Sequence, residues 1–206
     1  MTALYGLLAL VIGVFLWLVN GVRRIGAVSV GSRVETGDAT ALLLIDLQTV
    51  FWDDGPYSDQ AKSEAQAVIE QEVAQARKQG DPIIAVRQEW SIPSTKAIAR
   101  LTMKGQAIAG TAGTELANAF ANVSDETVTK RVQDAFETKA LAPLLEGRGV
   151  GAVRIVGLDF NHCVAKTAMA ARNRGYDVTV VTGGTLAAAP TEAMRKTLLR
   201  RGVQLA

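Results

Sequence analysis

Two patterns of hydrophobic residues follow one another from residue 41 to the end of this chain. Short apolar runs predict buried strands over 41–45, 83–86, 126–129, 152–156 and 177–181, with 203–205 as a candidate sixth strand. Longer stretches with one apolar side predict helices over 60–79, 114–120, 138–146, 163–175 and 191–201. Strands that alternate with helices in this way predict a parallel sheet covered by helices on both faces.

The first 25 residues follow neither pattern. Between residues 3 and 22 the only polar side chains are those of Tyr5 and Asn20, and such a stretch is long enough to cross a bilayer as a helix. Arg23 and Arg24 follow it, and no basic residue precedes it. By the positive-inside rule, this pattern predicts a single-pass membrane protein with its main domain on the cytoplasmic side.

The predicted organisation is a transmembrane anchor over 1–25, a linker over 26–40 and one α/β domain over 41–206. The linker is rich in Gly, Ser and Thr, which favours flexibility. A cleaved signal peptide is the alternative for the anchor, but signal peptides carry their positive charge before the apolar core. A buried core helix is the third interpretation, and it is not favoured for a segment at the extreme N-terminus that has no polar face.

Composition narrows the classes of function. The chain has 22 basic and 20 acidic residues, a net charge of +2, so no nucleic-acid partner is expected. Its single cysteine excludes an internal disulfide, and its single histidine excludes a metal site that needs two histidines. The glycine clusters at 147–151 and 182–185 match neither a dinucleotide fingerprint nor a P-loop, so no cofactor is expected.

Several polar residues stand where predicted strands end. Asp46, Arg87 and Lys130 each follow or close an apolar run, and a turn leads from Gly157 to Cys163. The carboxyl ends of parallel strands converge on one crevice, so we expect these groups to lie together. A cysteine at the start of a helix faces unpaired N–H groups, which favour the thiolate. The alternative is a small buried hydrophobic residue.

Cys163, Asp46 and Lys130 form a complete set for acyl transfer without histidine. The carboxylate would take the proton of the thiol, and the ammonium would polarise a carbonyl group and keep Asp46 ionised. The alternatives are a capping aspartate and a solvated surface lysine. His162 is adjacent to Cys163, but neighbouring helical residues point apart, so a Cys–His pair is not expected.

The order of these residues resembles that of the isochorismatase-like cysteine hydrolases, from about residue 41 to residue 181. The matching motifs are Leu44-Ile-Asp46-Leu-Gln48, Gly110-Thr-Ala-Gly-Thr-Glu115, Lys130, Phe136 with Thr138 and Leu141, Gly157-x5-Cys163-Val164, Thr167 and Gly175-Tyr176. The resemblance implies a three-layer αβα fold with a six-stranded parallel sheet. It also implies a Cys163–Asp46–Lys130 triad that cleaves an amide or carbamoyl C–N bond through a thioacyl intermediate.

The resemblance further implies an unusual cis peptide bond between Leu158 and Asp159, and an oxyanion hole formed by the N–H groups of Asp159 and Cys163. Residues in the positions that contact substrate are Arg87, Glu89, Trp90 and Phe160. Relatives often form dimers or tetramers, so a homo-oligomer is compatible with it.

This chain departs from the family at two places. The usual Ala-Thr of the turn is Asp159-Phe160, which leaves open a non-catalytic, membrane-tethered binding protein as the alternative function. Nicotinamidases of the family bind a metal with an Asp and two His, a set that one histidine cannot supply. No metal site is therefore expected, and the substrate is expected to be a small amide or carbamoyl compound.

Overall fold

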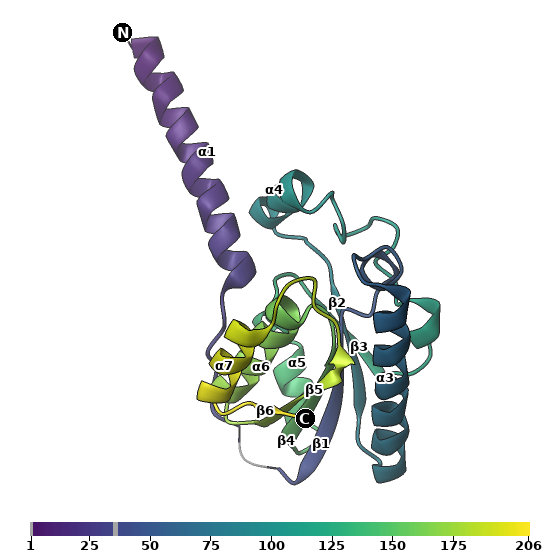
Figure 1. Ribbon diagram of the computed structural model, residues 1–206. Coiled ribbons are helices and arrows are strands. Elements are labelled where there is room, and N and C mark those ends of the chain that lie inside the picture. The colour runs from purple at the N-terminus through teal and green to yellow at the C-terminus, as the bar shows by residue number, and fades with distance from the viewer. Residues whose placement is uncertain (1, 35–36) are drawn as a thin grey trace.

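The computed structural model describes residues 2–34 and 37–206, and it confirms the predicted α/β architecture. Six parallel strands form one sheet in the order β3-β2-β1-β4-β5-β6 (Figure 1). The strands are β1 (Ala39–Ile45), β2 (Ile83–Gln88), β3 (Glu126–Lys130), β4 (Val150–Gly157), β5 (Asp177–Thr185) and β6 (Gln204–Leu205).

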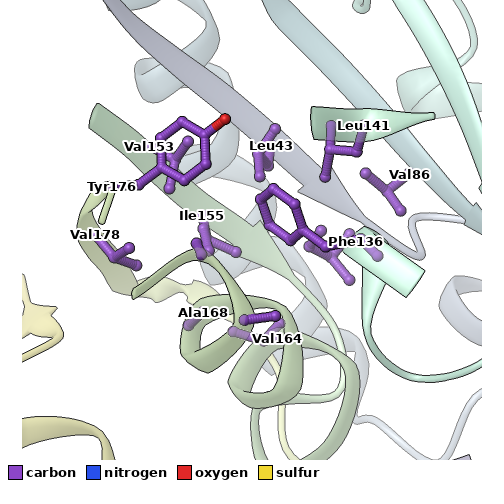
Figure 2. Close-up of a cluster of buried hydrophobic side chains, with 14 of the residues drawn as sticks. Leu43, Val86, Phe136, Leu141, Val153, Ile155, Val164, Ala168, Tyr176 and Val178 are labelled. Carbon is purple, nitrogen blue, oxygen red and sulfur yellow. The ribbon is translucent and has the colours of Figure 1, made fainter. Parts of the chain in front are cut away.

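Helices cover both faces of the sheet, so the domain has three layers (Figure 1). The long helix α3 (Asp59–Gln79) lies on one face, where its apolar residues pack against Leu42 and Leu44 of β1. Leu43 and Ile45, on the other side of the same strand, pack toward α5 (Leu141–Glu146), α6 (Ala165–Asn173) and α7 (Glu192–Arg200). Figure 2 shows Leu43 in this second core. Burial on both faces explains why β1 is a continuous apolar run.

The segment between β2 and β3 differs from the prediction. Residues 88–113 are expected to be irregular, but they contain the ten-residue helix α4 (Pro93–Thr102). The prediction of a helix over 114–120 is wrong, because only a single 3₁₀ turn forms there, at Asn118–Phe120. The backbone N–H of Ala117 donates instead to the carbonyl of Leu47, which holds this segment extended beside the end of β1.

The order in which the chain adds strands to the sheet changes direction at β1. The chain adds β2 and β3 on one side of β1 and then returns to place β4 on the other side. In open α/β sheets, the crevice at the carboxyl ends of strands that flank such a point is the usual ligand site. Asp46, after β1, and the turn that carries Cys163, after β4, therefore meet at this crevice.

The N-terminal helix α1 (Thr2–Gly26) projects from the domain on the side where α4 lies (Figure 1). Its stretch Leu4–Gly26 is long and apolar enough to cross a membrane. Its last turns pack on the domain: Leu18 and Ile25 join an apolar cluster with Ile98 of α4, and a Cβ on Gly21 would lie only 3.0 Å from the Cβ of Ser94.

The sequence predicts a flexible linker over 26–40, but the described part of it is held to the domain. The N–H of Ser29 donates to the Asp134 carboxylate at 2.7 Å, its carbonyl accepts from Asn173 at 3.0 Å, and the N–H of Val34 donates to the carbonyl of Arg174 at 2.9 Å. Polar groups of the segment thus find partners on the domain surface. Residues 35–36 lie outside the described part of the chain.

Candidate active site

Three polar side chains from separate strands meet at the carboxyl edge of the sheet. Asp46 directly follows β1, Lys130 is the last residue of β3, and Cys163 lies in the turn after β4. The Lys130 Nζ lies 2.9 Å from Asp46 Oδ2 and 3.3 Å from Cys163 Sγ. All three side chains are buried, Lys130 completely. The sequence places them at strand ends, and the fold brings them into contact.

Two glutamines hold the ammonium group of Lys130 in place. Gln88, the register partner of Lys130 on β2, accepts a hydrogen bond from Lys130 through its side-chain oxygen. Gln48 in turn accepts from the N–H of Gln88 at 2.6 Å and donates to the carbonyls of Gln88 and Thr114. The three protons of the ammonium therefore point at the carboxylate, the sulfur and the amide oxygen.

The burial of these groups controls their ionisation. Burial raises the pKa of Asp46 above its usual 3.8, although the charge of Lys130 opposes the shift. Burial by itself lowers the pKa of Lys130. The Coulomb attraction and hydrogen bonds of Asp46 and Cys163 raise it by more, so the pKa of Lys130 lies above its usual 10.5. At their separation of 2.9 Å, the charge of each group favours the ionised form of the other.

The surroundings of Cys163 favour the neutral thiol, whereas the sequence predicts a thiolate. Burial is the main reason that its pKa is raised, and the Asp46 carboxylate adds to the effect more than Lys130 offsets it. Within the described residues, Asp46 Oδ1 is buried without a hydrogen-bond partner, and the carboxylate interacts with the thiol. This free oxygen is an acceptor for the thiol proton.

The backbone turn before Cys163 is held by Asp159. The peptide bond between Leu158 and Asp159 is cis, and a π turn over Phe160–Val164 leads into α6. One Asp159 oxygen accepts the N–H of Asn161 at 2.8 Å, and the other accepts the N–H of Ala188 at 2.7 Å and the hydroxyl of Tyr57 at 3.3 Å. Both oxygens are therefore occupied in fixing the turn.

A cavity of about 420 Å³ opens above the sulfur, a size that suits a small ligand. Its wall includes Phe51, Tyr57, Trp90, Met103, Gln133 and Leu158, and Cys163 and Asp46 also line it. The wall is mainly apolar, so the polar triad stands at one end of a largely hydrophobic cavity.

The predicted substrate-contacting residues are only partly in this cavity. Trp90 lines it, as expected, and its indole N–H has no partner among the described residues. Arg87 and Glu89 are not in the wall, because they form an ion pair with each other beside it. Phe160 is a correction as well: it is 2% exposed and packs in the core with α6.

Several residues of the cavity wall could not be identified from the sequence. Tyr57 lies in the turn before α3, Met103 is the residue after α4, and Gln133 follows β3. None of them stands in a motif, and each reaches the cavity only through the path of its loop. Gln88, which also lines the cavity, could have been identified from the sequence. It is the last residue of β2, as Lys130 is the last residue of β3, and strand ends point to the site.

The residues at the end of β2 do not fit the metal site of the nicotinamidases. Glu89 is paired with Arg87, and the side-chain oxygen of Gln88 is occupied by Lys130. In the two described ranges, no three His, Cys, Asp or Glu side chains lie close enough to hold a metal ion.

The family model of the isochorismatase domain matches residues 40–205. The chain belongs to the isochorismatase family. Solved structures similar to it include a pyrazinamidase/nicotinamidase from Streptococcus mutans, with a TM-score of 0.68 and 24% identity over 82% of this chain and 100% of that one. An N-carbamoylsarcosine amidase from Thermoplasma acidophilum has a TM-score of 0.69 and 21% identity over 81% and 95%. An isochorismatase family protein from Desulfovibrio vulgaris has a TM-score of 0.69 and 26% identity over 81% and 93%.

Proposed function

We propose that this protein is a cysteine hydrolase that cleaves the C–N bond of an amide or carbamoyl compound through a thioacyl intermediate. The observation that carries the proposal is the Lys130 ammonium within 2.9 Å of Asp46 and 3.3 Å of Cys163, in a buried site under a cavity. Membership of the isochorismatase family supports it, and similar structures include proteins named as amidases.

The proposed reaction has two steps. The thiol proton of Cys163 moves to Asp46 as the sulfur attacks the carbonyl carbon; the C–N bond then breaks, and the nitrogen leaves with that proton as ammonia or an amine. In the second step, Asp46 takes a proton from water, the resulting hydroxide attacks the thioester, and the carboxylic acid leaves as the thiol is restored. The ammonium of Lys130 stabilises the negative charges that form on sulfur and oxygen.

Backbone N–H groups are proposed to form the oxyanion hole. Leu158, Asp159 and Cys163 all line the cavity. The N–H groups of Leu158 and Phe160 donate to Ile45 and Leu186, whereas that of Asp159 has no acceptor in the described residues. We assign the N–H groups of Asp159 and Cys163 to this role, in which one donor contributes a few kcal/mol to a transition state.

The hydrogen bonds of Asp159 weaken the case for a non-catalytic protein. An additional carboxylate beside the nucleophile would oppose its ionisation. Both oxygens of Asp159, however, accept backbone hydrogen bonds, one from Asn161 in the turn and the other from Ala188. The pKa of Cys163 is set by its burial and by the charges of Asp46 and Lys130, and not by Asp159. The unusual Asp159-Phe160 pair is thus compatible with catalysis.

Ammonia release from a panel of primary amides and carbamoyl compounds tests the function. We expect the full-length protein to release ammonia from at least one class, and Cys163→Ala to lose at least about 10⁴-fold in kcat/KM, because the covalent step is removed. The matched control is Cys163→Ser, which keeps a nucleophilic atom of lower reactivity and the same packing. Equal ammonia release by the wild-type and Cys163→Ala proteins on every compound would refute the proposal.

The pH dependence of kcat/KM tests Asp46 as the base. Because burial raises its pKa, the activity is expected to rise with pH through a midpoint above 3.8. At higher pH the activity should stay constant up to about pH 10, because the pKa of Lys130 is raised above 10.5 and its ammonium group keeps its charge there. Circular dichroism at each pH separates this rise from acid unfolding. A midpoint that is unchanged in Asp46→Glu would refute Asp46 as the base.

We further propose that α1 anchors the protein as a single transmembrane span with the hydrolase domain on the cytoplasmic side. Its length, its apolar composition and the pair Arg23 and Arg24 at its domain end support this orientation. The exposed apolar side chains of residues 4–17 also support it, since a helix in water would not present them.

A further inference from the structure

The N-terminal helix and the active-site cavity share a wall. Leu18 and Ile25 of α1 lie in one apolar cluster with Trp90, Ile98 and Met103. Trp90 and Met103 also line the cavity. In addition, the carbonyl of Ile25 accepts a hydrogen bond of 3.1 Å from the N–H of Gln133, another wall residue. The end of the proposed span is therefore part of the structure that surrounds the site.

The proposed span overlaps the part of α1 that contacts the domain. The stretch that is long and apolar enough to cross a membrane is Leu4–Gly26, and contact with the domain begins at Leu18. A span over these residues would place α4, which touches Gly21 through Ser94, at the surface of the bilayer.

The residues of α4 suit that position. The charged residues between 91 and 104 are all basic, namely Lys96, Arg100 and Lys104. Beside them Leu101 is 72% exposed. Arg23 and Arg24 stand at the end of α1, which α4 contacts. Basic residues together with an exposed apolar side chain favour contact with anionic headgroups. We call α4 and the end of α1 the interfacial face.

The cavity itself favours an apolar ligand. Its wall contains Phe51, Trp90, Met103 and Leu158, and among the described residues that line it none is Arg or Lys. A substrate with a carboxylate of its own would find no free Arg or Lys among the described residues of the wall, since the ammonium of Lys130 is bound by Asp46, Cys163 and Gln88. A neutral amide group attached to an apolar chain fits this cavity, because the amide would lie at the polar end beside Cys163 and the chain along the apolar wall.

We propose that the substrate is a membrane-resident amphiphile, whose neutral amide or carbamoyl group reaches Cys163 from the interfacial face while its alkyl chain stays among Trp90, Met103 and the bilayer. This inference rests on the proposed hydrolase function. For a long-chain primary amide, the reaction adds one water across the C–N bond and releases ammonia and the fatty acid. No other reactant is required.

A series of chain lengths tests the substrate class. The full-length protein in phosphatidylcholine–phosphatidylglycerol vesicles is given butanamide, octanamide and dodecanamide, and the corresponding alkyl carbamates, and ammonia is measured. We expect kcat/KM to rise at least about ten-fold from the four-carbon to the twelve-carbon compound, because each buried methylene adds favourable free energy. Ammonia release no greater than that of Cys163→Ala on this series, but above it on another amide of the panel, would refute the membrane substrate alone, whereas no difference on any compound of either set would refute the hydrolase function. Equal rates on short and long chains would refute only the membrane substrate.

Two matched surface variants separate the role of the interfacial face from that of general hydrophobicity. Leu101→Glu is expected to lower the rate on dodecanamide at least about five-fold in vesicles and to leave butanamide within about two-fold. Leu199→Glu on α7 is the control, since Leu199 is also exposed, at 56%, but lies on another helix. Equal effects of the two variants would contradict the proposal.

The position of α4 can also be measured without catalysis. Cys163→Ala has no cysteine, so Leu101→Cys and Leu199→Cys can each be added to it and labelled with a bimane fluorophore. In vesicles containing brominated phosphatidylcholine, we expect quenching of the label at position 101 and not of that at 199. Unquenched fluorescence at both positions would show that α4 does not touch the bilayer and would overturn the inference.

Discussion

Replacing Lys130 with methionine is expected to lower the free energy of unfolding by about 3–5 kcal/mol and to abolish detectable hydrolysis. The side chain is completely buried, and its ammonium is the cation that balances the carboxylate of Asp46, which is only 2% exposed. Methionine fills the same space but leaves that charge buried and unpaired, which is the costly case for a buried ion pair. Hydrolysis fails because protonation of Asp46 then removes the base.

The double variant Lys130→Met with Asp46→Asn separates charge from packing. A neutral pair has no uncompensated charge, so we expect it to recover most of the lost stability while it remains inactive. Denaturant unfolding followed by the fluorescence of the buried Trp52 and Trp90 measures both variants. If the single and double variants were equally unstable, lost packing rather than charge would explain the effect.

The sheet could be predicted because its strands are buried on both faces. Leu42 and Leu44 pack on one side of β1 and Leu43 and Ile45 on the other, so the run contains no polar position. A run of this kind has few alternatives to a central parallel strand. The register of the strands and the order of the sheet needed long-range contacts or the family resemblance.

The helix α4 could not be predicted with equal ease. It has ten residues, and its apolar side contacts α1 rather than the sheet, so its pattern does not match that of a core helix. The local signal was present, because Pro93 stands at its first position, which is common at helix starts. Helices that depend on a distant segment for their packing are poorly predicted from their own residues.

The proximity of Asp46, Lys130 and Cys163 was predictable because each stands at a strand end or in the turn that follows one, and the sequence marks these positions. The wall of the cavity was not, and Phe160 shows why. It is adjacent to Asp159 at the site, yet the π turn directs its ring into the core. Conversely, the raised pKa of Cys163 depends on its burial and on its position beside Asp46 and Lys130, which no local pattern reveals. The position of a residue in the sequence therefore indicated proximity to the site, but not the direction of its side chain.

Replacing Gly157 with alanine is expected to lower the free energy of unfolding by about 3–5 kcal/mol, as expected of a steric clash at a special backbone position. Gly157 ends β4 at φ +113°, and a Cβ there would lie 2.1 Å from the carbonyl oxygen of Ile45. That carbonyl accepts the hydrogen bond from Leu158, which joins the Cys163 turn to β1. Relief of the clash would move the turn away from Asp46, so activity should fall in the protein that remains folded.

Gly80→Ala is the matched control for the Gly157 variant, because it separates backbone strain from the clash. Gly80 ends α3 at φ +75°, but a Cβ there would meet no atom within 4 Å. Its replacement should cost only the strain of a left-handed residue, about 1–2 kcal/mol. It should leave kcat/KM unchanged, since Gly80 lies just before β2 begins, at the edge of the sheet opposite the triad. Similar losses of stability in the two variants, measured by denaturant unfolding, would show that strain alone explains both and that β1 yields to the methyl group. A larger loss in Gly157→Ala, together with lower activity, would show that close contact between β1 and β4 holds the nucleophile beside its base.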